Sequence, residues 1–147
     1  MTKYVPDISS KRWVIVSANR GARPDQNGKK KGDKKAICIF CSGNEKLTTE
    51  EVYRVGEGEK NEKGWKVRVI SNKFPITDLH EVVVHSPDEV GDIFEYPQDQ
   101  VEAILTAYRD RFNFYRSKGQ VLIFCNHGEH AGASIIHPHS QIVVLPP

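Results

Sequence analysis

The sequence predicts an α+β fold, a mainly antiparallel sheet with one long helix packed on one face. Two observations predict this fold class. Several short apolar segments, bounded by turn residues, have the length and composition of strands, and one longer segment has the periodicity of an amphipathic helix. The 147 residues suit a single domain with its own core, residues 1–147. A helix that crosses between two strands is expected to cover one face of their sheet.

Five segments are expected to form strands. The clearest is WKVRVIS, residues 65–71, whose alternation places Trp65, Val67, Val69 and Ser71 on one face. The other four are apolar or weakly alternating runs: RWVIVS (12–17), HEVVVHS (80–86), QVLIFCN (120–126) and SQIVVLP (140–146).

The long helix is predicted over residues 97–117, with Pro97 in its first turn. Its apolar residues fall at i, i+3, i+4, i+7, i+11 and i+14, which makes a single stripe: Val101, Ile104, Leu105, Tyr108, Phe112 and Tyr115. A shorter helix is expected over residues 48–55, capped by Thr48 or Thr49.

Composition excludes several classes of protein. Hydrophobic residues make up 38% of the chain and charged residues 27%, the balance of a soluble globular protein. No stretch approaches the roughly 20 apolar residues that span a bilayer, and the N-terminus lacks an apolar signal region, so a cytoplasmic protein without a membrane partner is expected. The net charge of +2 is too small to indicate a nucleic-acid partner, and the basic run at residues 29–35 is expected to be a solvated loop.

The cysteines do not form a disulfide framework, because there are three of them and no secretion signal is visible. Cys38 and Cys41 make a C-x-x-C, a spacing that lets two thiolates reach one ion but also occurs in redox sites. The redox version usually opens a helix, whereas here Gly43 and Asn44 indicate a turn. Cys125 is interpreted as a small buried strand residue.

Two histidines near the C-terminus, His137 and His139, stand two positions apart. In an extended segment they share one face with Gln141, because alternate residues point the same way. Imidazole binds metals, transfers protons or attacks an electrophile such as phosphorus. The small residues of NHGEHAGAS, just upstream, let backbone N–H groups come close to a phosphate. Taken alone, H-x-H equally fits a polar loop before an edge strand.

Six segments of the chain, taken in order, carry a specific resemblance. They are SSKRWVIVSANRGARP, CIFCSGNE, VISNKFP, HEVVVHSPDE, VLIFCNHGEHAGAS and GASIIHPHSQIVVLP. Together they resemble the N-terminal half of the galactose-1-phosphate uridylyltransferase family, a branch of the histidine-triad superfamily. The most specific of them is H-P-H-x-Q after a loop of small residues. The resemblance covers nearly all of the chain and implies a histidine-triad-like fold.

The resemblance implies a nucleotidyltransferase that moves a nucleoside monophosphate between a nucleotide sugar and a sugar 1-phosphate. His139 matches the nucleophile, which attacks the α-phosphorus and holds the nucleotidyl group covalently, and Gln141 matches a hydrogen-bond partner of that phosphoryl group. The remaining matches are phosphate partners and residues of the base and ribose pocket: Ser134, Asn126, Arg20 and Arg23 for the phosphates, and Asn72, Phe74 and Phe40 for the pocket.

The resemblance also implies one structural zinc ion per chain, since Cys38, Cys41 and His137 match zinc ligands. A structural site takes four ligands, and Glu89 stands where the family commonly has the fourth, a histidine. Glutamate ligates zinc through oxygen, so we expect Glu89 to complete the site. His80 and His85 are nearby alternatives.

The length leaves alternatives open. Family members with two tandem half-domains are more than twice as long, so the chain is either a naturally short relative or an N-terminal piece. Single half-domain histidine-triad proteins work as homodimers, and a homodimer is expected here. Lys73 stands where well-known members carry an acidic residue on the ribose, which leaves base and sugar open. Other interpretations are a nucleoside-diphosphate-sugar or dinucleoside-polyphosphate phosphorylase, a histidine-triad hydrolase, and a non-catalytic nucleotide- or zinc-binding module.

Overall fold

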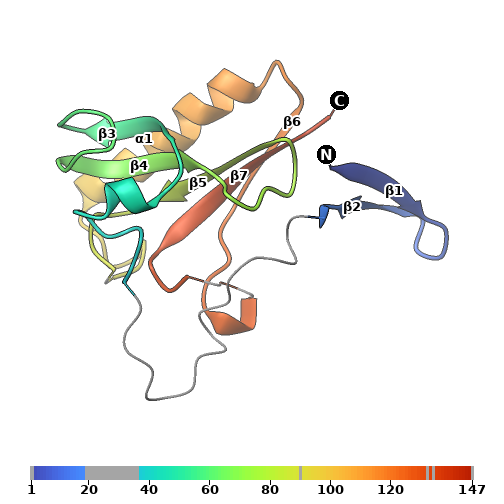
Figure 1. Ribbon diagram of the computed structural model, residues 1–147, viewed down its shortest axis with the longest axis horizontal. Coiled ribbons are helices and arrows are strands. Elements are labelled where there is room, and N and C mark those ends of the chain that lie inside the picture. Colours follow the sequence, from blue (N-terminus) through green and yellow to red (C-terminus); the bar gives the residue numbers. More distant parts are fainter. Residues whose placement is uncertain (1, 19–36, 90, 132, 134, 147) are drawn as a thin grey trace.

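A computed structural model describes residues 2–18, 37–89, 91–131, 133 and 135–146. Within these residues one helix of 18 residues, α1 (Gln98–Tyr115), accompanies two antiparallel sheets (Figure 1). The smaller sheet is the hairpin β1 (Lys3–Asp7) and β2 (Arg12–Val16). The larger has the order β3-β4-β5-β7-β6, and its strands are β3 (Glu51–Gly56), β4 (Trp65–Ser71), β5 (Leu79–Val84), β6 (Gln120–Phe124) and β7 (His139–Leu145).

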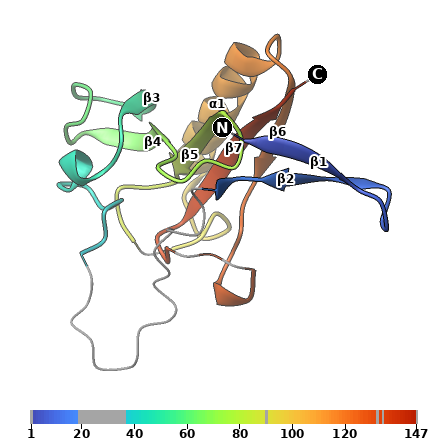
Figure 2. The ribbon, with the colours of Figure 1, turned by 45° about the vertical axis from the view of Figure 1, so that its right-hand side comes forward.

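The predicted architecture, an antiparallel sheet with a helix on one face, is confirmed. In Figures 1 and 2, α1 lies across one face of the five-stranded sheet. Inward side chains of the sheet and of α1 form one buried apolar cluster, which includes Val67, Val69, Val83, Ile104, Ala107 and Ile142. Burying β-branched side chains against a helix stabilises the layer by the area that it removes from water.

The stripe of α1 that faces the sheet differs from the predicted one. Leu105 and Phe112 are 54% and 44% exposed, while Ala107 and Arg111 are buried. Arg111 is buried because its guanidinium meets the carboxylate of Glu81 on β5, with Nε–Oε2 and Nη2–Oε1 distances of 2.9 and 2.5 Å. Apolar periodicity cannot reveal such a pair, because arginine counts as polar in the pattern.

The opposite face of the sheet carries a second apolar cluster, formed by Phe40, Trp65, Ile70, Val82 and Val84. Trp65 was predicted to share a face with Val67 and Val69, and this is wrong. The register between β3 and β4 shifts between Val55 and Gly56, so that Lys66 is an extra residue in β4. Such a bulge breaks the alternation, and Trp65 turns to the other face.

The helix predicted over residues 48–55 is wrong. The chain makes only a short 3-10 turn, η2 (Glu45–Leu47), and then enters β3, which pairs with β4. Tyr53 and Val55 pack against the core cluster, so tertiary pairing outweighs the local capping signal. Cys125 was predicted to be a buried strand residue, but it follows the end of β6 and is exposed.

The N-terminal hairpin extends away from the larger sheet (Figure 2). Strand 12–17 was predicted, whereas its partner β1 was not. Two hydrogen bonds tie the hairpin to the loop after β4, from Thr2 Oγ1 to Ile76 O and from Ser17 Oγ to Pro75 O, at 3.2 and 2.8 Å. The expected basic loop at residues 29–35 lies outside the described residues. No helix in the described ranges has both the length and the apolar character to cross a bilayer.

The buried pair between α1 and β5 generates a stability prediction. Arg111→Met leaves the Glu81 carboxylate buried without its cation, which costs about 3–5 kcal/mol of unfolding free energy. Urea denaturation measures it. The matched control is Arg109→Met, because the Arg109–Asp110 pair is exposed and contributes less than about 1 kcal/mol. Equal losses in the two variants would contradict the importance of the buried pair.

Candidate functional site

Two polar side chains near the start of β7, those of His139 and Gln141, lie on the sheet face away from α1. His139 and Gln141 are 7% and 4% exposed and line a cavity of about 310 Å³. The His139 ring lies at a fixed angle, because its Nδ1 donates to the carbonyl oxygen of His137 at 2.8 Å. A neutral imidazole with its proton on Nδ1 has its lone pair on Nε2. His139 therefore has the tautomer that a nucleophile requires.

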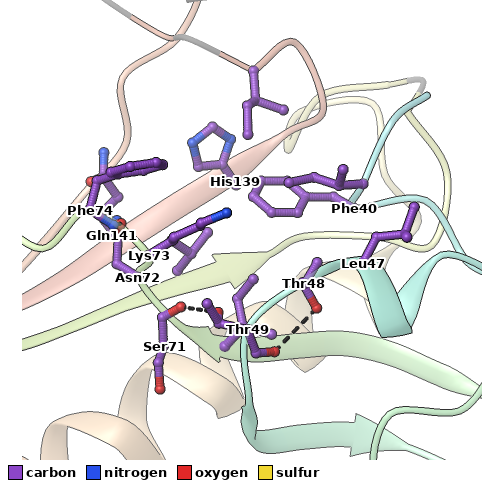
Figure 3. Close-up of a pocket in the computed structure, with 14 residues that line it drawn as sticks. Phe40, Leu47, Thr48, Thr49, Ser71, Asn72, Lys73, Phe74, His139 and Gln141 are labelled. Carbon is purple, nitrogen blue, oxygen red and sulfur yellow. Dashed lines mark hydrogen bonds between the residues drawn. The ribbon is translucent and has the colours of Figure 1, made fainter. Parts of the chain in front are cut away.

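The cavity beside His139 is lined by both apolar and polar side chains (Figure 3). Phe40, from the turn between the two cysteines, packs edge-on against His139 at 5.5 Å between ring centroids. In Figure 3 the side chain of Lys73 extends into the cavity, below His139 and toward Phe40. Lys73 is the one charged residue among those that line the cavity in the described part of the chain. The cavity therefore suits a ligand with a flat apolar end and a negative charge.

The turn after β4 brings Asn72 and Phe74, of the VISNKFP segment, to the cavity. Asn72 Oδ1 accepts the backbone N–H of Phe74 at 2.8 Å, and the Asn72 N–H donates to His80 O at 2.9 Å. These bonds fix the turn. They place an amide and an aromatic ring beside Gln141 (Figure 3).

A second cavity, of about 240 Å³, lies on another side of His139. Asn126 and Cys125 line it from the end of β6, and Glu89 and Asp92 line it from the loop before α1. His139 and Ile135 border both cavities. The imidazole of His139 therefore borders two separate cavities.

Cys38, Cys41 and His137 form a group with the geometry of a metal site. Their ligand atoms all lie within 4.8 Å of one another, and the two sulfurs lie 3.3 and 3.6 Å from Nδ1 of His137. The other ring nitrogen, Nε2, donates to Ser86 O at 2.8 Å. Metal-binding histidines typically hold their second nitrogen in this way, which turns the lone pair of the first toward the ion. Two sulfurs and one imidazole nitrogen fit zinc.

The two thiols differ in acidity. Burial raises the pKa of Cys38, but hydrogen bonds with His137 and Cys41 outweigh it and hold that pKa below its usual value. Burial, the hydrogen bond with Cys38 and the negative charges nearby raise the pKa of Cys41 to about 12. Cys38 therefore loses its proton more readily than Cys41. A bound cation deprotonates both.

The fourth ligand stays a prediction. The carboxylate of Glu89 is not part of the compact group of three, although the charge of Glu89 is one cause of the raised pKa of Cys41. The two alternative histidines make other contacts. His85 Nε2 lies 2.7 Å from Ser140 Oγ, and His80 Nε2 lies 2.9 Å from Gln141 Oε1. Burial and the charge of His139 lower the pKa of His85 to about 4, so that it is neutral.

Three of the predicted site residues, Arg20, Arg23 and Ser134, lie outside the described residues. The others, except Asn126 and Glu89, meet at the larger cavity or at the cysteine group beside it. Sequence reasoning missed Leu47, Thr48 and Thr49, which line the far end of the cavity from His139 (Figure 3). It missed them because the segment was interpreted as the start of a helix.

A family model describes residues 24–146 as the N-terminal domain of DUF4931, a domain of unknown function. Among curated proteins, an ADP-glucose phosphorylase from Arabidopsis thaliana is 30% identical over 95% of this chain and 47% of its own length. A diadenosine tetraphosphate phosphorylase from Saccharomyces cerevisiae is 29% identical over 96% of the chain and 41% of its length. A galactose-1-phosphate uridylyltransferase from Thermotoga maritima is 30% identical over 91% of this chain and 43% of its own length.

Solved structures agree on the fold. The Arabidopsis thaliana ADP-glucose phosphorylase, crystallised with ADP-glucose, superposes with a TM-score of 0.68 at 30% identity, over all of this chain and 49% of that one. A histidine-triad protein from Clostridium difficile superposes with a TM-score of 0.56 at 18% identity, over 78% of this chain and 95% of that one. The second likeness shows the histidine-triad fold alone.

The chain thus spans about half the length of the curated relatives that it matches. Its fold, its H-P-H-S-Q strand and its Cys-Cys-His group agree with the resemblance found in the sequence. The chain belongs to the DUF4931 N-terminal domain family, is similar in sequence to an ADP-glucose phosphorylase and to a galactose-1-phosphate uridylyltransferase, and has a fold like that of histidine-triad proteins.

Proposed function

We propose that this chain carries the nucleophilic site of a nucleotidyltransferase, which moves a nucleoside monophosphate from a nucleotide sugar to a phosphate acceptor. The observation that supports this most is the 2.8 Å hydrogen bond from Nδ1 of His139 to the His137 carbonyl. It fixes the proton on Nδ1, so the lone pair of the neutral ring is on Nε2. A histidine without this bond exchanges between two tautomers, and only one of them is nucleophilic at Nε2.

The reaction has two displacements at phosphorus. In the first, Nε2 of His139 attacks the α-phosphorus, an N–P bond forms, and the bond to the sugar 1-phosphate oxygen breaks. The leaving group is a phosphate monoester, which needs no proton. The ring becomes positively charged, and the Nδ1–H bond to the His137 carbonyl stabilises that charge. In the second, a phosphate oxygen of the acceptor attacks the same phosphorus and the N–P bond breaks.

The surrounding residues have separate roles in the proposal. Gln141, which borders the cavity next to His139, hydrogen-bonds the transferring phosphoryl group. Asn126, in the second cavity, binds the outer phosphate. Asn72, Phe74 and Phe40 hold the ribose and the base. On the strength of the sequence resemblance, Arg20, Arg23 and Ser134 bind further phosphate oxygens.

Cys38, Cys41, His137 and Glu89 are proposed to hold one zinc ion with a structural role. A closed shell of four protein ligands leaves no position for substrate, so the ion supplies a cross-link and not a Lewis acid. The cross-link joins the turn that carries Phe40 to the strand that carries His139.

A phosphorylase is the second proposal, because two of the reported relatives are phosphorylases of adenine nucleotides. In that reaction the acceptor is inorganic phosphate. The far end of the cavity also favours adenine over uracil. Leu47 lines this end with an apolar side chain, and the hydroxyls of Thr48 and Thr49, which also line it, already donate to the carbonyls of Glu45 and Ser71. Adenine gains more from apolar contact, whereas uracil needs polar partners for two carbonyls.

The nucleophile is tested with His139→Asn. The variant should form nucleotidyl-protein at least about a thousandfold more slowly, because His139 is the one imidazole that lines the cavity among the described residues. Incubation with labelled nucleotide sugar, followed by mass spectrometry, measures the adduct. His137→Asn serves for comparison and should mainly weaken metal binding or folding. An adduct formed by the His139→Asn variant at the wild-type rate would exclude this assignment.

The base and the acceptor are tested together by comparing ADP-glucose with UDP-glucose as donors, each with inorganic phosphate. The apolar end of the cavity predicts faster release of glucose 1-phosphate from ADP-glucose. Preference for UDP-glucose, with activity only when a hexose 1-phosphate is the acceptor, would instead support the uridylyltransferase. An adduct that neither inorganic phosphate nor a hexose 1-phosphate can release would argue against both the phosphorylase and the uridylyltransferase.

The metal is tested by elemental analysis and by melting with and without chelator. One zinc per chain is expected. Its removal should lower stability by about 4 kcal/mol, by analogy with a disulfide that closes a loop of this length. Cys38→Ser should lower both zinc content and melting temperature. Protein with far less than one zinc per chain and a melt insensitive to chelator would exclude the site, whereas full zinc loading in Glu89→Ala would exclude only the fourth ligand.

A further inference from the structure

His80 is a buried histidine that the proposed reaction does not use. It lies on β5, is 5% exposed, and shares a sheet face with Gln141 on the neighbouring β7. Its two ring nitrogens make three contacts with described residues. Nδ1 lies 2.9 Å from the backbone N–H of Ile76, and Nε2 lies 2.9 Å from Gln141 Oε1 and 3.1 Å from Asn72 Nδ2.

These contacts determine where the His80 proton lies. The Ile76 backbone N–H is a fixed donor, so Nδ1 must accept, and the proton of the neutral ring is on Nε2. This tautomer satisfies the contacts with Ile76 and Gln141. The other tautomer would set two N–H groups against each other at Nδ1 and two lone pairs against each other at Gln141, and would satisfy Asn72 alone. Two satisfied contacts outweigh one.

The Nε2–H group of His80 in turn orients the amide of Gln141. Because Gln141 Oε1 accepts from His80, the amide nitrogen of Gln141 is turned away from β5, and Gln141 borders the cavity beside His139. A side-chain amide that rotated by half a turn would present its oxygen to the ligand, and an oxygen repels a phosphoryl oxygen. The orientation therefore decides whether Gln141 assists or opposes the transfer.

We propose that His80 is a positioning residue for nucleotidyl transfer. Its Nε2–H holds Gln141 with the amide N–H groups directed at the transferring phosphoryl group. This inference rests on the proposed function. It differs from a purely structural role in one measurable respect, because the effect of His80 on the rate passes through Gln141.

Two matched substitutions separate the contacts of His80. The amide oxygen of His80→Asn occupies the place of Nδ1 and can still accept from Ile76, but the side chain does not reach Gln141. The longer side chain of His80→Gln reaches Gln141 with an N–H donor. Single-turnover formation of the nucleotidyl adduct is measured with ADP-glucose, UDP-glucose and diadenosine tetraphosphate, and nucleotide affinity is measured by calorimetry. Melting temperature and zinc content report on folding.

The rate of adduct formation should fall about 10- to 100-fold in His80→Asn, while nucleotide affinity changes less than about threefold. His80→Gln should recover most of the wild-type rate. In a Gln141→Ala background, His80→Asn should cost no more than about twofold, since the two residues act as one unit. An equal cost in both backgrounds, or equal rates in the Asn and Gln variants, would overturn the positioning role. Absence of any adduct in wild-type protein with all three donors would overturn the proposed function and this inference together.

Discussion

His137 is the residue on which the geometry of the site depends. Its Nδ1 faces the sulfurs of Cys38 and Cys41, its Nε2 donates to Ser86 O, and its own carbonyl accepts the Nδ1–H of His139. One residue therefore joins the cysteine turn, the end of β5 and the first residue of β7. A fully buried imidazole with both nitrogens engaged has little freedom, so the carbonyl beside it is an equally fixed acceptor. The tautomer of His139, the proposed nucleophile, therefore depends on the residue that also belongs to the Cys38–Cys41–His137 group.

A buried cation organises the other side of the cavity in a similar way. Arg68 on β4 is 1% exposed and contacts Glu51 Oε2 at 2.6 Å, Thr48 Oγ1 at 2.8 Å and Asn61 Oδ1 at 2.9 Å. These bonds hold the segment before β3 against the sheet, which places Thr48 and Thr49 at the far end of the cavity. Fully paired buried charges confer a specific arrangement more than net stability. This end of the cavity thus depends on a residue, Arg68, that does not line it.

Local signals in the sequence predicted what depends on neighbours along the chain. The strands predicted at residues 65–71 and 140–146 correspond closely in their bounds to β4 and β7, and two residues of the H-P-H-S-Q motif, His139 and Gln141, line the cavity. The structural predictions that were wrong concern residues whose partners are distant in the sequence. Residues 48–55 have a local helix signal, but residues 51–56 pair with β4 as a strand. Arg111 is polar in the helical pattern, but the carboxylate of Glu81 allows it to be buried. The bulge at Lys66 arises from the register between β3 and β4. The link between His80 and Gln141, 61 residues apart, has no signature in either segment.

The central claim is that the His137 carbonyl fixes the His139 proton on Nδ1 and leaves Nε2 to attack phosphorus. Long-range ¹H–¹⁵N correlation spectra of zinc-loaded protein with ¹⁵N-labelled histidine test it directly, because protonated, unprotonated and metal-bound ring nitrogens have distinct shifts. The expected result is His139 protonated at Nδ1 with an unprotonated Nε2, beside a His137 protonated at Nε2. A His139 protonated at Nε2 would block the attacking nitrogen and contradict the proposed chemistry.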